Sequence, residues 1–234
     1  MVKFADDLTL VTLAAATVSV EAEFASVHSW ARDNKLQINL AKTKEIVITR
    51  CGRRGFMQPP LIPGVARENL VKLLGITVNN HLFFADHVRK LQTVARQRLY
   101  LLQLLKRQGL DTTCLDVVFK AIVSSTIVYA MPAFSGNLTE SVVNMLQAVI
   151  NKAFKLGYLS SIPDLRSLIS RADRQLSNKL NTNAQHCLAP FLPSERNLET
   201  RSTLRARGHR FCLPHYKSKS FKDAYLNRVL FLHF

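Results

Sequence analysis

The sequence predicts an α+β protein in which a region of short strands and one helix is followed by helices alone. Short apolar segments of alternating polarity, separated by turn residues, fill the chain up to about residue 82. From residue 83 the apolar residues recur every three or four positions, as they do in amphipathic helices. Prolines and arginines become frequent after residue 161, which predicts a basic, partly ordered tail.

The first predicted element is a hairpin that carries two adjacent carboxylates. If the apolar segments 1–5 and 8–16 pair as antiparallel strands, Asp6 and Asp7 lie together at an exposed turn. A divalent cation can neutralise such a pair. Asp-Asp pairs are also common in ordinary turns, where their side chains bond to the backbone. The pair therefore indicates a metal site only if other segments support it.

The second predicted element is a helix over residues 19–33. Apolar side chains recur at Val20, Phe24 and Val27, and acidic residues occupy the first turn, where the helix dipole favours them. Trp30 continues this apolar stripe, so we expect its ring in the core rather than against a ligand.

Strands are expected in the remainder of the first region. The alternating segment 36–40 and the apolar segment 46–48 predict two strands on either side of a turn at 41–44. Segment 71–78 predicts one further strand, with a bend or a close backbone approach at Gly75.

Residues 83–160 predict a small helical bundle with a basic exterior. A long helix is expected over 86–108, with Gly109 directly after its end. The apolar segments 112–130 and 139–157 predict two more helices.

The tail, residues 161–234, contains one predicted helix at 164–181. Beyond that helix, several prolines and an arginine cluster within 200–210 favour an extended chain. The arginine cluster is a candidate phosphate-contacting patch.

The charge balance predicts a polyanionic partner. Lys and Arg outnumber Asp and Glu by 32 to 16, which gives a formal net charge of +16. We expect nucleic acid rather than a membrane, because no lipidation signal and no apolar run of about 18 residues accompanies the charge. The absence of a signal peptide and the wide spacing of the cysteines predict an intracellular protein of the nucleus or cytoplasm. The cysteines are Cys51, Cys114, Cys187 and Cys212.

Three segments in a fixed order resemble the reverse transcriptases of non-LTR (LINE-like) retrotransposons. They are Phe4–Asp7, Asn34–Lys44 with Trp30 before it, and Lys72–Ile76. The similarity continues into Asn79–Val88. Each motif is weak alone, and the ordered set over residues 2–108 carries the resemblance.

The resemblance implies a domain organisation and an activity. Residues 1–82 would be the C-terminal part of a polymerase palm, residues 83–160 a helical thumb-like domain, and residues 161–234 a basic C-terminal region. The implied activity is RNA-directed DNA polymerisation, with an RNA template, a DNA primer and Mg²⁺ or Mn²⁺. Deoxynucleotides would be its only small-molecule substrates.

The resemblance also assigns roles to residues. Asp6 would be the main metal ligand and Asp7 a secondary one, and Lys42 would offer charge or a proton to the leaving pyrophosphate. The residues that would hold the primer terminus are Leu73, Leu74 and Gly75, the last because a side chain there would collide with the primer. The basic residues that would follow the duplex backbone without reading sequence are Arg89, Lys90, Arg96 and Arg98.

One part of the family's pattern has no counterpart in this sequence. The family's other metal-binding aspartate lies on an earlier palm strand, which would precede Met1, and no similar strand follows. With one carboxylate strand of the two, the metal site is incomplete. We therefore expect a fragment that does not polymerise DNA by itself.

Three alternatives stay open at this point. The chain could be a non-catalytic remnant that binds nucleic acid through its basic helices. It could bind zinc in its tail, although the ligand types there lack the regular spacing of a finger; they are His186, Cys187, His209, Cys212 and His215. It could also be a receiver domain of a two-component regulator, although the alternating βα units that such a domain needs do not follow.

Overall fold

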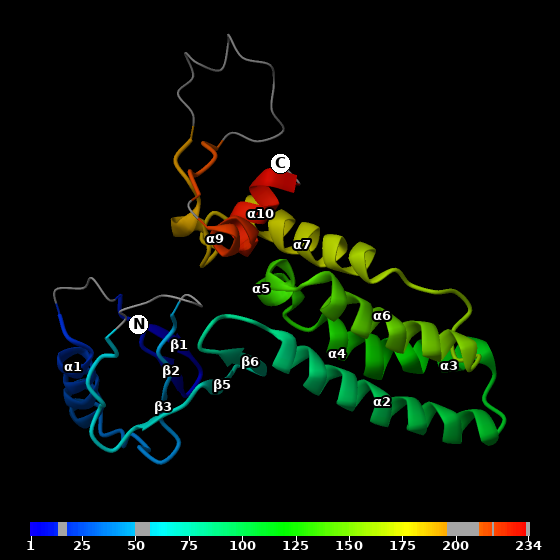
Figure 1. Cartoon of the computed structure of the whole chain (residues 1–234), viewed down its shortest axis with the longest axis horizontal. Helices are drawn as coiled ribbons and strands as arrows, with labels where there is room; N and C mark the ends of the chain where they lie inside the picture. The colour runs from blue at the N-terminus through cyan, green and yellow to red at the C-terminus, as the bar shows by residue number, and fades with distance from the viewer. Residues whose placement is uncertain (14–17, 50–56, 196–210, 217, 233–234) are drawn as a thin grey trace, which may run out of the picture. The chain divides into compact units, whose positions relative to one another are not determined.

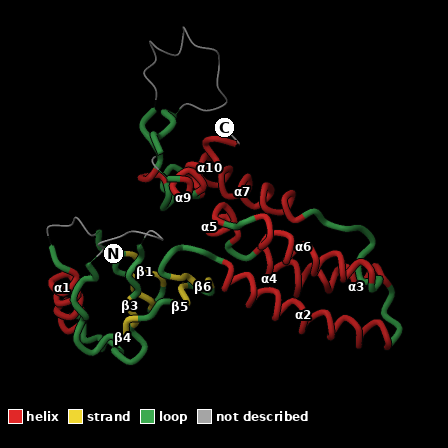
Figure 2. The backbone as a smooth tube through the Cα atoms, viewed as in Figure 1, coloured by secondary structure: helices red, strands yellow, loops and turns green. Residues whose placement is uncertain are grey.

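The chain forms two compact units (Figure 1). The computed structural model describes residues 1–13, 18–49, 57–195, 211–216 and 218–232. The first unit contains Met1–Lys72 and Asn79–His81, and the second contains Leu73–Val78 and Leu82–Phe234. Helices predominate and the strands are short, so the expected α+β class is correct (Figure 2).

The first unit begins with the predicted hairpin. Strands β1 (Val2–Phe4) and β2 (Asp7–Thr9) pair antiparallel, with Phe4 opposite Asp7. The loop is therefore Ala5-Asp6, and Ala5 has a left-handed φ of 51°. The second strand ends at Thr9, well before the predicted residue 16, and residues 14–17 lie outside the described part of the chain.

Helix α1 (Val20–Asp33) confirms the predicted helix, but its tryptophan is not in the core. Ser19 caps the helix by accepting a hydrogen bond from Ala22 N at 3.2 Å. The side chain of Trp30 is 39% exposed, with Lys3 Nζ 5.5 Å from its ring centroid. The predicted core position of Trp30 was therefore wrong, because α1 buries only a narrow face around Val27 and Ala31.

The strands expected at 36–40 and 46–48 do not form. The strands in this region are β3 (Lys44–Glu45) and β4 (Ala66–Arg67), which pair parallel. The side chains of Arg67 and Glu45 make a two-point ion pair across them, at 2.8 and 3.0 Å. The strands that form in this region are thus joined by a charged pair, whereas the sequence predicted strands in the apolar segments 36–40 and 46–48.

The segment predicted as one bent strand is a hairpin. Strands β5 (Leu70–Leu73) and β6 (Ile76–Asn79) form a two-stranded sheet. The two loop residues, Leu74 and Gly75, have φ values of 45° and 88°. Two left-handed residues in a two-residue loop are typical of a type I′ turn, so the chain reverses at Gly75 rather than bending there.

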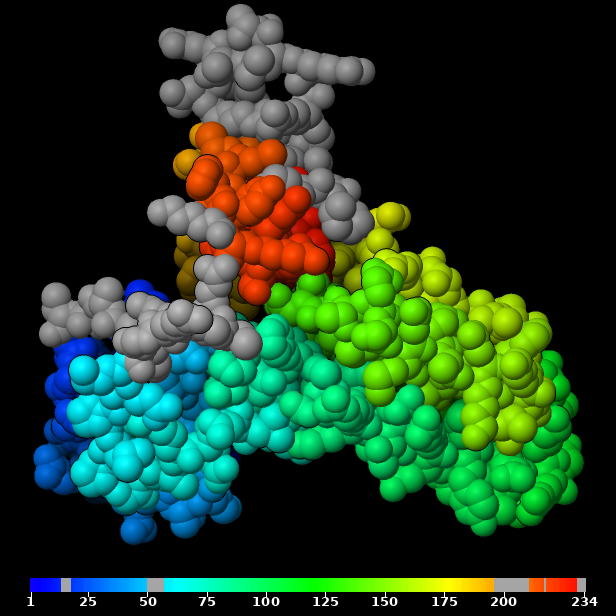
Figure 3. All heavy atoms as spheres, in the orientation of Figure 1, coloured from blue at the N-terminus to red at the C-terminus, as the bar shows by residue number. Residues whose placement is uncertain are grey.

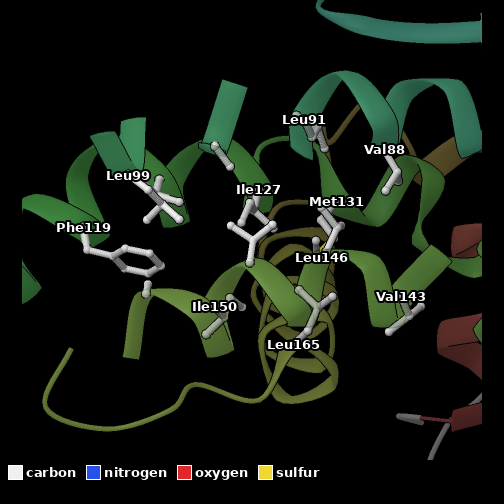
Figure 4. Packing of buried hydrophobic residues seen from close by; sticks show 14 of the residues in the cluster. Val88, Leu91, Leu99, Phe119, Ile127, Met131, Val143, Leu146, Ile150 and Leu165 are labelled. Carbon is white, nitrogen blue, oxygen red and sulfur yellow. The ribbon is translucent and has the colours of Figure 1, made fainter. Parts of the chain in front are cut away.

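The second unit is a helical bundle, and its helices agree with the three predicted over residues 86–157. Its elements are α2 (Ala85–Arg107), α3 (Thr112–Phe119), the π-helix η1 (Lys120–Ser124), α4 (Ser125–Val128), α5 (Met131–Phe134), η2 (Ser135–Asn137) and α6 (Glu140–Lys155). Apolar side chains from these helices form one core between α2 and the helices that face it (Figure 4). The most deeply buried include Val88, Leu102, Phe119, Ile127, Met131 and Leu146.

The described part of the tail is folded against this bundle, which differs from the expected extended chain. Its elements are α7 (Leu165–Thr182), which confirms the predicted helix, then η3 (Ala189–Phe191), α9 (Lys219–Asp223) and α10 (Tyr225–Leu232). Helices α7 and α10 both contact α5, and α9 contacts η2. In Figure 3 the yellow and orange atoms of the tail lie directly against the green atoms of the bundle. The arginine cluster expected within 200–210 lies outside the described residues.

Within the described residues, one helical stretch is long and apolar enough to cross a membrane by length and composition. It runs over 26 residues, Thr112–Asn137. Its side chains Leu115, Phe119, Val123 and Ile127 are at most 1% exposed in the core of the bundle. Core helices of soluble proteins pass the same composition test, so the stretch is weak support for a membrane span.

Candidate nucleic-acid interface

The two adjacent carboxylates lie at the exposed turn of the first hairpin. Asp6 is in the loop and Asp7 opens β2, and both residues are exposed. Among the described residues no group of three or more His, Cys, Asp and Glu side chains could hold a metal ion. The turn therefore offers two of the oxygen-bearing side chains that Mg²⁺ prefers, without a third nearby.

Lys42 lies in a turn whose shape is set by Asn39. The backbone N–H of Lys42 donates to Asn39 Oδ1 at 3.1 Å, and Thr43 Oγ1 donates to Asn39 O at 2.9 Å. The Lys42 ammonium is exposed and makes no ion pair within the part of the chain that is described. It belongs to the same unit as Asp6 and Asp7, and no recorded interaction joins it to them.

The tip of the β5–β6 hairpin belongs to the second unit and is held by Tyr129. The Tyr129 hydroxyl donates to Leu74 O at 3.1 Å. A Cβ atom added to Gly75 would lie 3.1 Å from Cε1 of the Tyr129 ring. The glycine is thus required by an internal contact and by its positive φ, whereas sequence analysis attributed it to a primer. Leu73 and Leu74 remain exposed at this tip.

A buried histidine fastens the same hairpin to α2. Thr77 N donates to His87 Nδ1 at 3.3 Å, and Lys90 Nζ donates to Thr77 Oγ1 at 3.2 Å. Because Nδ1 accepts, the ring proton is on Nε2, which is buried without a partner in the described part of the chain. The edge of the ring packs on Phe134 at 4.8 Å between centroids.

The charge state of His87 follows from this environment. Burial lowers the pKa of His87, and the nearby Lys90 charge lowers it further. The imidazole is therefore neutral near pH 7. Sequence analysis missed this residue, although its position one residue before Val88 and four before Leu91 already places it on the apolar stripe of α2.

The four basic residues predicted on α2 do not share one surface. Arg89 is exposed and pairs with Asp86 at 2.7 Å, and Arg96 is exposed. Lys90 is engaged with Thr77, as described above. Arg98 points into the bundle, where its guanidinium donates to the carbonyl of Ile122 in η1 and to Thr126 Oγ1.

Two exposed residues that sequence analysis did not select complete the outer face of α2. Arg96 is seven residues after Arg89, and Arg107 is eleven residues after Arg96. Steps of seven and of eleven residues both return to nearly the same face of an α-helix, so the three arginines share one face. Tyr100 lies on this face as well and is 58% exposed. The outer face, defined by Arg89, Arg96, Tyr100 and Arg107, therefore carries three cations and one aromatic ring.

The zinc ligand types of the tail are not assembled in the described residues. Cys187 and Cys212 are exposed, and His186 Nδ1 accepts from Leu188 N at 3.2 Å. His209 and Cys51 lie outside the described residues. The described part of the tail thus contains no group of three or more side chains that could hold a zinc ion.

The chain was compared with protein-family models, with curated proteins and with solved structures. None of the three comparisons gave a match.

Proposed function

We propose that this chain is part of an RNA-directed DNA polymerase of the non-LTR retrotransposon type. It contributes one carboxylate strand of a two-metal site and surfaces that bind the primer–template duplex. The single observation that carries the proposal is the ordered set of segments, in which an Asp-Asp hairpin turn is followed by a lysine turn and then by a second tight hairpin.

The chemistry of nucleotidyl transfer fits these residues. Two divalent ions, held by carboxylates from more than one strand, would activate the primer hydroxyl and stabilise the leaving pyrophosphate. Asp6 serves as the main ligand, Asp7 as a secondary ligand and Lys42 as a cation for the triphosphate. The described residues bring no further ligand group to Asp6 and Asp7, so the site needs at least one more carboxylate.

The second unit supplies the duplex-binding surfaces. The exposed hairpin tip, with Leu73 and Leu74, contacts the sugar end of the primer. Arg89, Arg96 and Arg107 on the outer face of α2 contact phosphates, which gives affinity without sequence preference. Lys90 supports the hairpin through its bond to Thr77 Oγ1, and Arg98 supports η1 through its bond to the Ile122 carbonyl.

A primer-extension assay tests the catalytic part of this proposal. The chain alone is expected to incorporate no deoxynucleotide, because its metal site lacks carboxylates. The chain fused behind the upstream palm half of a non-LTR reverse transcriptase is expected to show Mg²⁺-dependent incorporation that Asp6→Asn abolishes. A folded fusion whose incorporation is unchanged by Asp6→Asn would contradict the role of Asp6.

A second candidate function is non-catalytic nucleic-acid binding, which the cationic outer face of α2 favours. In that case duplex binding persists in Asp6→Asn/Asp7→Asn and weakens in Arg89→Gln/Arg96→Gln. Each lost phosphate contact lowers the slope of log K against log salt by about 0.9. If the folded palm fusion incorporates no deoxynucleotide and duplex binding follows this pattern, the chain is a non-catalytic nucleic-acid-binding protein.

A further inference from the structure

An apolar pocket of about 600 Å³ lies within the second unit, where the end of the tail meets the bundle. Its walls include Pro132 of α5, Leu176 of α7, Phe191 of η3, and Phe221 and Tyr225 of α9 and α10. None of the roles assigned above uses it. Its volume is within the range of about 300–1,000 Å³ that is usual for small-ligand sites.

Two phenylalanine rings of this pocket are largely in water. Phe191 is 71% exposed and Phe221 is 48% exposed, although the two residues belong to separate segments. Exposed aromatic rings that converge on one pocket are a common mark of a binding site, whereas single exposed apolar residues are normal. The two exposed rings, Phe191 and Phe221, are therefore suited to a ligand with flat apolar faces.

Hydrogen bonds fix α10, which forms one wall of the pocket, to α7 and η2. Arg228 of α10 donates to both carboxylate oxygens of Asp173, at 3.0 and 2.8 Å, and also to Ser135 Oγ at 3.1 Å. The Tyr225 hydroxyl donates to Asp173 O at 3.3 Å. Burial raises the pKa of Tyr225 to about 12, so this hydroxyl keeps its proton. These bonds hold the Tyr225 side of the pocket in place.

One buried polar side chain lines the pocket. Asn227 is 8% exposed, and its Nδ2 donates to Phe221 O at 2.6 Å. This bond fixes the orientation of the amide and leaves Oδ1 without a partner among the described residues. An acceptor beside aromatic faces suits a flat ligand that carries N–H groups, as nucleobases do.

The surrounding charge favours a polyanion over an apolar peptide. Of the described residues from 163 onward, seven are lysine or arginine and four are acidic. Lys179 is one turn beyond Leu176 on α7, Lys219 is two residues before Phe221, and both are exposed. A cationic surface with exposed aromatic rings is the usual arrangement for unpaired nucleic acid, because a duplex hides the faces of its bases.

We propose that this pocket binds unpaired bases of a single-stranded nucleic acid. The bases stack on Phe191 and Phe221, with Asn227 Oδ1 as an acceptor for their N–H groups. The strand's phosphates lie near Lys179 and Lys219. This site is separate from the outer face of α2 and does not require the chain to be a polymerase.

Binding of a fluorescent single-stranded RNA 12-mer and of an abasic backbone of equal length tests the proposal. The full chain is compared with Phe191→Ala/Phe221→Ala by fluorescence anisotropy. The variant is expected to bind the 12-mer at least tenfold more weakly, because stacking on each ring is lost. Its binding of the abasic strand and of a duplex is expected to be unchanged. Phe154→Ala, which removes an exposed ring on α6, is the matched control and is expected to change nothing.

Two results would overturn the proposal. One is equal binding of the 12-mer by the chain and the double variant, with circular dichroism showing both folded. The other is a proline-rich or apolar peptide that binds the pocket and that excess 12-mer does not displace, which would assign the pocket to a protein partner. Neither result bears on Asp6 or on duplex binding, so failure here is distinguishable from failure of the proposed function.

Discussion

At the scale of single residues, burial decides what a charged side chain does. Arg96 and Arg98 look equivalent in the sequence, but two positions on a helix correspond to about 200° of rotation. Arg96 therefore faces solvent, and Arg98 faces η1, where it donates to the Ile122 carbonyl. A π-helix shifts the backbone hydrogen-bonding register, and Arg98 supplies a donor there. Helical periodicity could have separated the two arginines, because Arg98 lies three residues after Ala95 and four before Leu102 on the buried face of α2. The acceptor of Arg98 could not have been predicted, because the π-helix has no sequence signature.

Replacement of Arg98 by alanine is expected to lower the free energy of unfolding by about 2–3 kcal/mol. The reason is the loss of charge-assisted hydrogen bonds to Ile122 O and Thr126 Oγ1. Urea unfolding followed by circular dichroism measures the change. Arg96→Ala is the matched control, with an expected change within about 0.5 kcal/mol. Equal effects of the two substitutions would show that Arg98 has no internal role.

The neutral state of His87 predicts a pH-dependent stability. Its pKa is lowered on folding, so the unfolded chain binds the proton more readily than the folded chain. The stability contribution is complete above the unfolded pKa of about 6.5 and is lost as the pH falls toward the lower folded pKa. The urea midpoint is expected to drop between pH 7.5 and pH 5. The drop should be smaller in His87→Gln, and an identical drop in both proteins would contradict this.

At the scale of elements, local turn chemistry explains where sequence analysis succeeded and where it failed. Helix α1 was predictable because Ser19 is a good N-cap and Val27 continues the apolar period. The β5–β6 hairpin was not, because leucine is rare at a left-handed position such as that of Leu74. An Asn-Gly pair at the same two positions would have predicted a type I′ turn. Tyr129, far along the chain, stabilises a reversal that Leu74-Gly75 does not signal.

Gly75→Ala is expected to destabilise the protein by about 1–2 kcal/mol. A Cβ atom disfavours the left-handed conformation and would press on the Tyr129 ring. A double-mutant cycle with Tyr129→Ala separates the two causes. If the contact with the Tyr129 ring contributes, Gly75→Ala lowers the free energy of unfolding by less in the Tyr129→Ala background than in the unaltered chain. An identical cost in both backgrounds would assign the whole effect to the backbone.

At the scale of the whole molecule, long-range pairs were beyond prediction from the sequence. The second unit contains a buried ion pair between Asp173 and Arg228, 55 residues apart, and the Asp173 side chain is 2% exposed. Neither residue stands out in the sequence, because both lie among many other charges. The bundle core was predictable from helical periodicity, whereas this pair, which joins α7 to α10, and the bond of Arg228 to Ser135 Oγ in η2 were not.

Asp173→Ala is expected to lower the free energy of unfolding by about 3–5 kcal/mol, because Arg228 is left buried without its counter-ion. Limited proteolysis should then cut after residue 211 faster than in the unaltered chain. The exposed pair between Glu140 and Arg166 provides the control, since Glu140→Ala should cost less than about 1 kcal/mol. A small effect of Asp173→Ala, with unchanged proteolysis, would show that the tail is held by apolar contacts alone.

The Asp173–Arg228 pair also limits how the gene can be shortened. A premature stop codon between codons 173 and 228 would remove the arginine and leave the Asp173 carboxylate without its counter-ion, so the shortened product should be cleared quickly by cellular proteases. Deletion of α7 together with the segment that follows it removes both charges and avoids this defect. Truncated expression clones should therefore end before α7 or extend past Arg228.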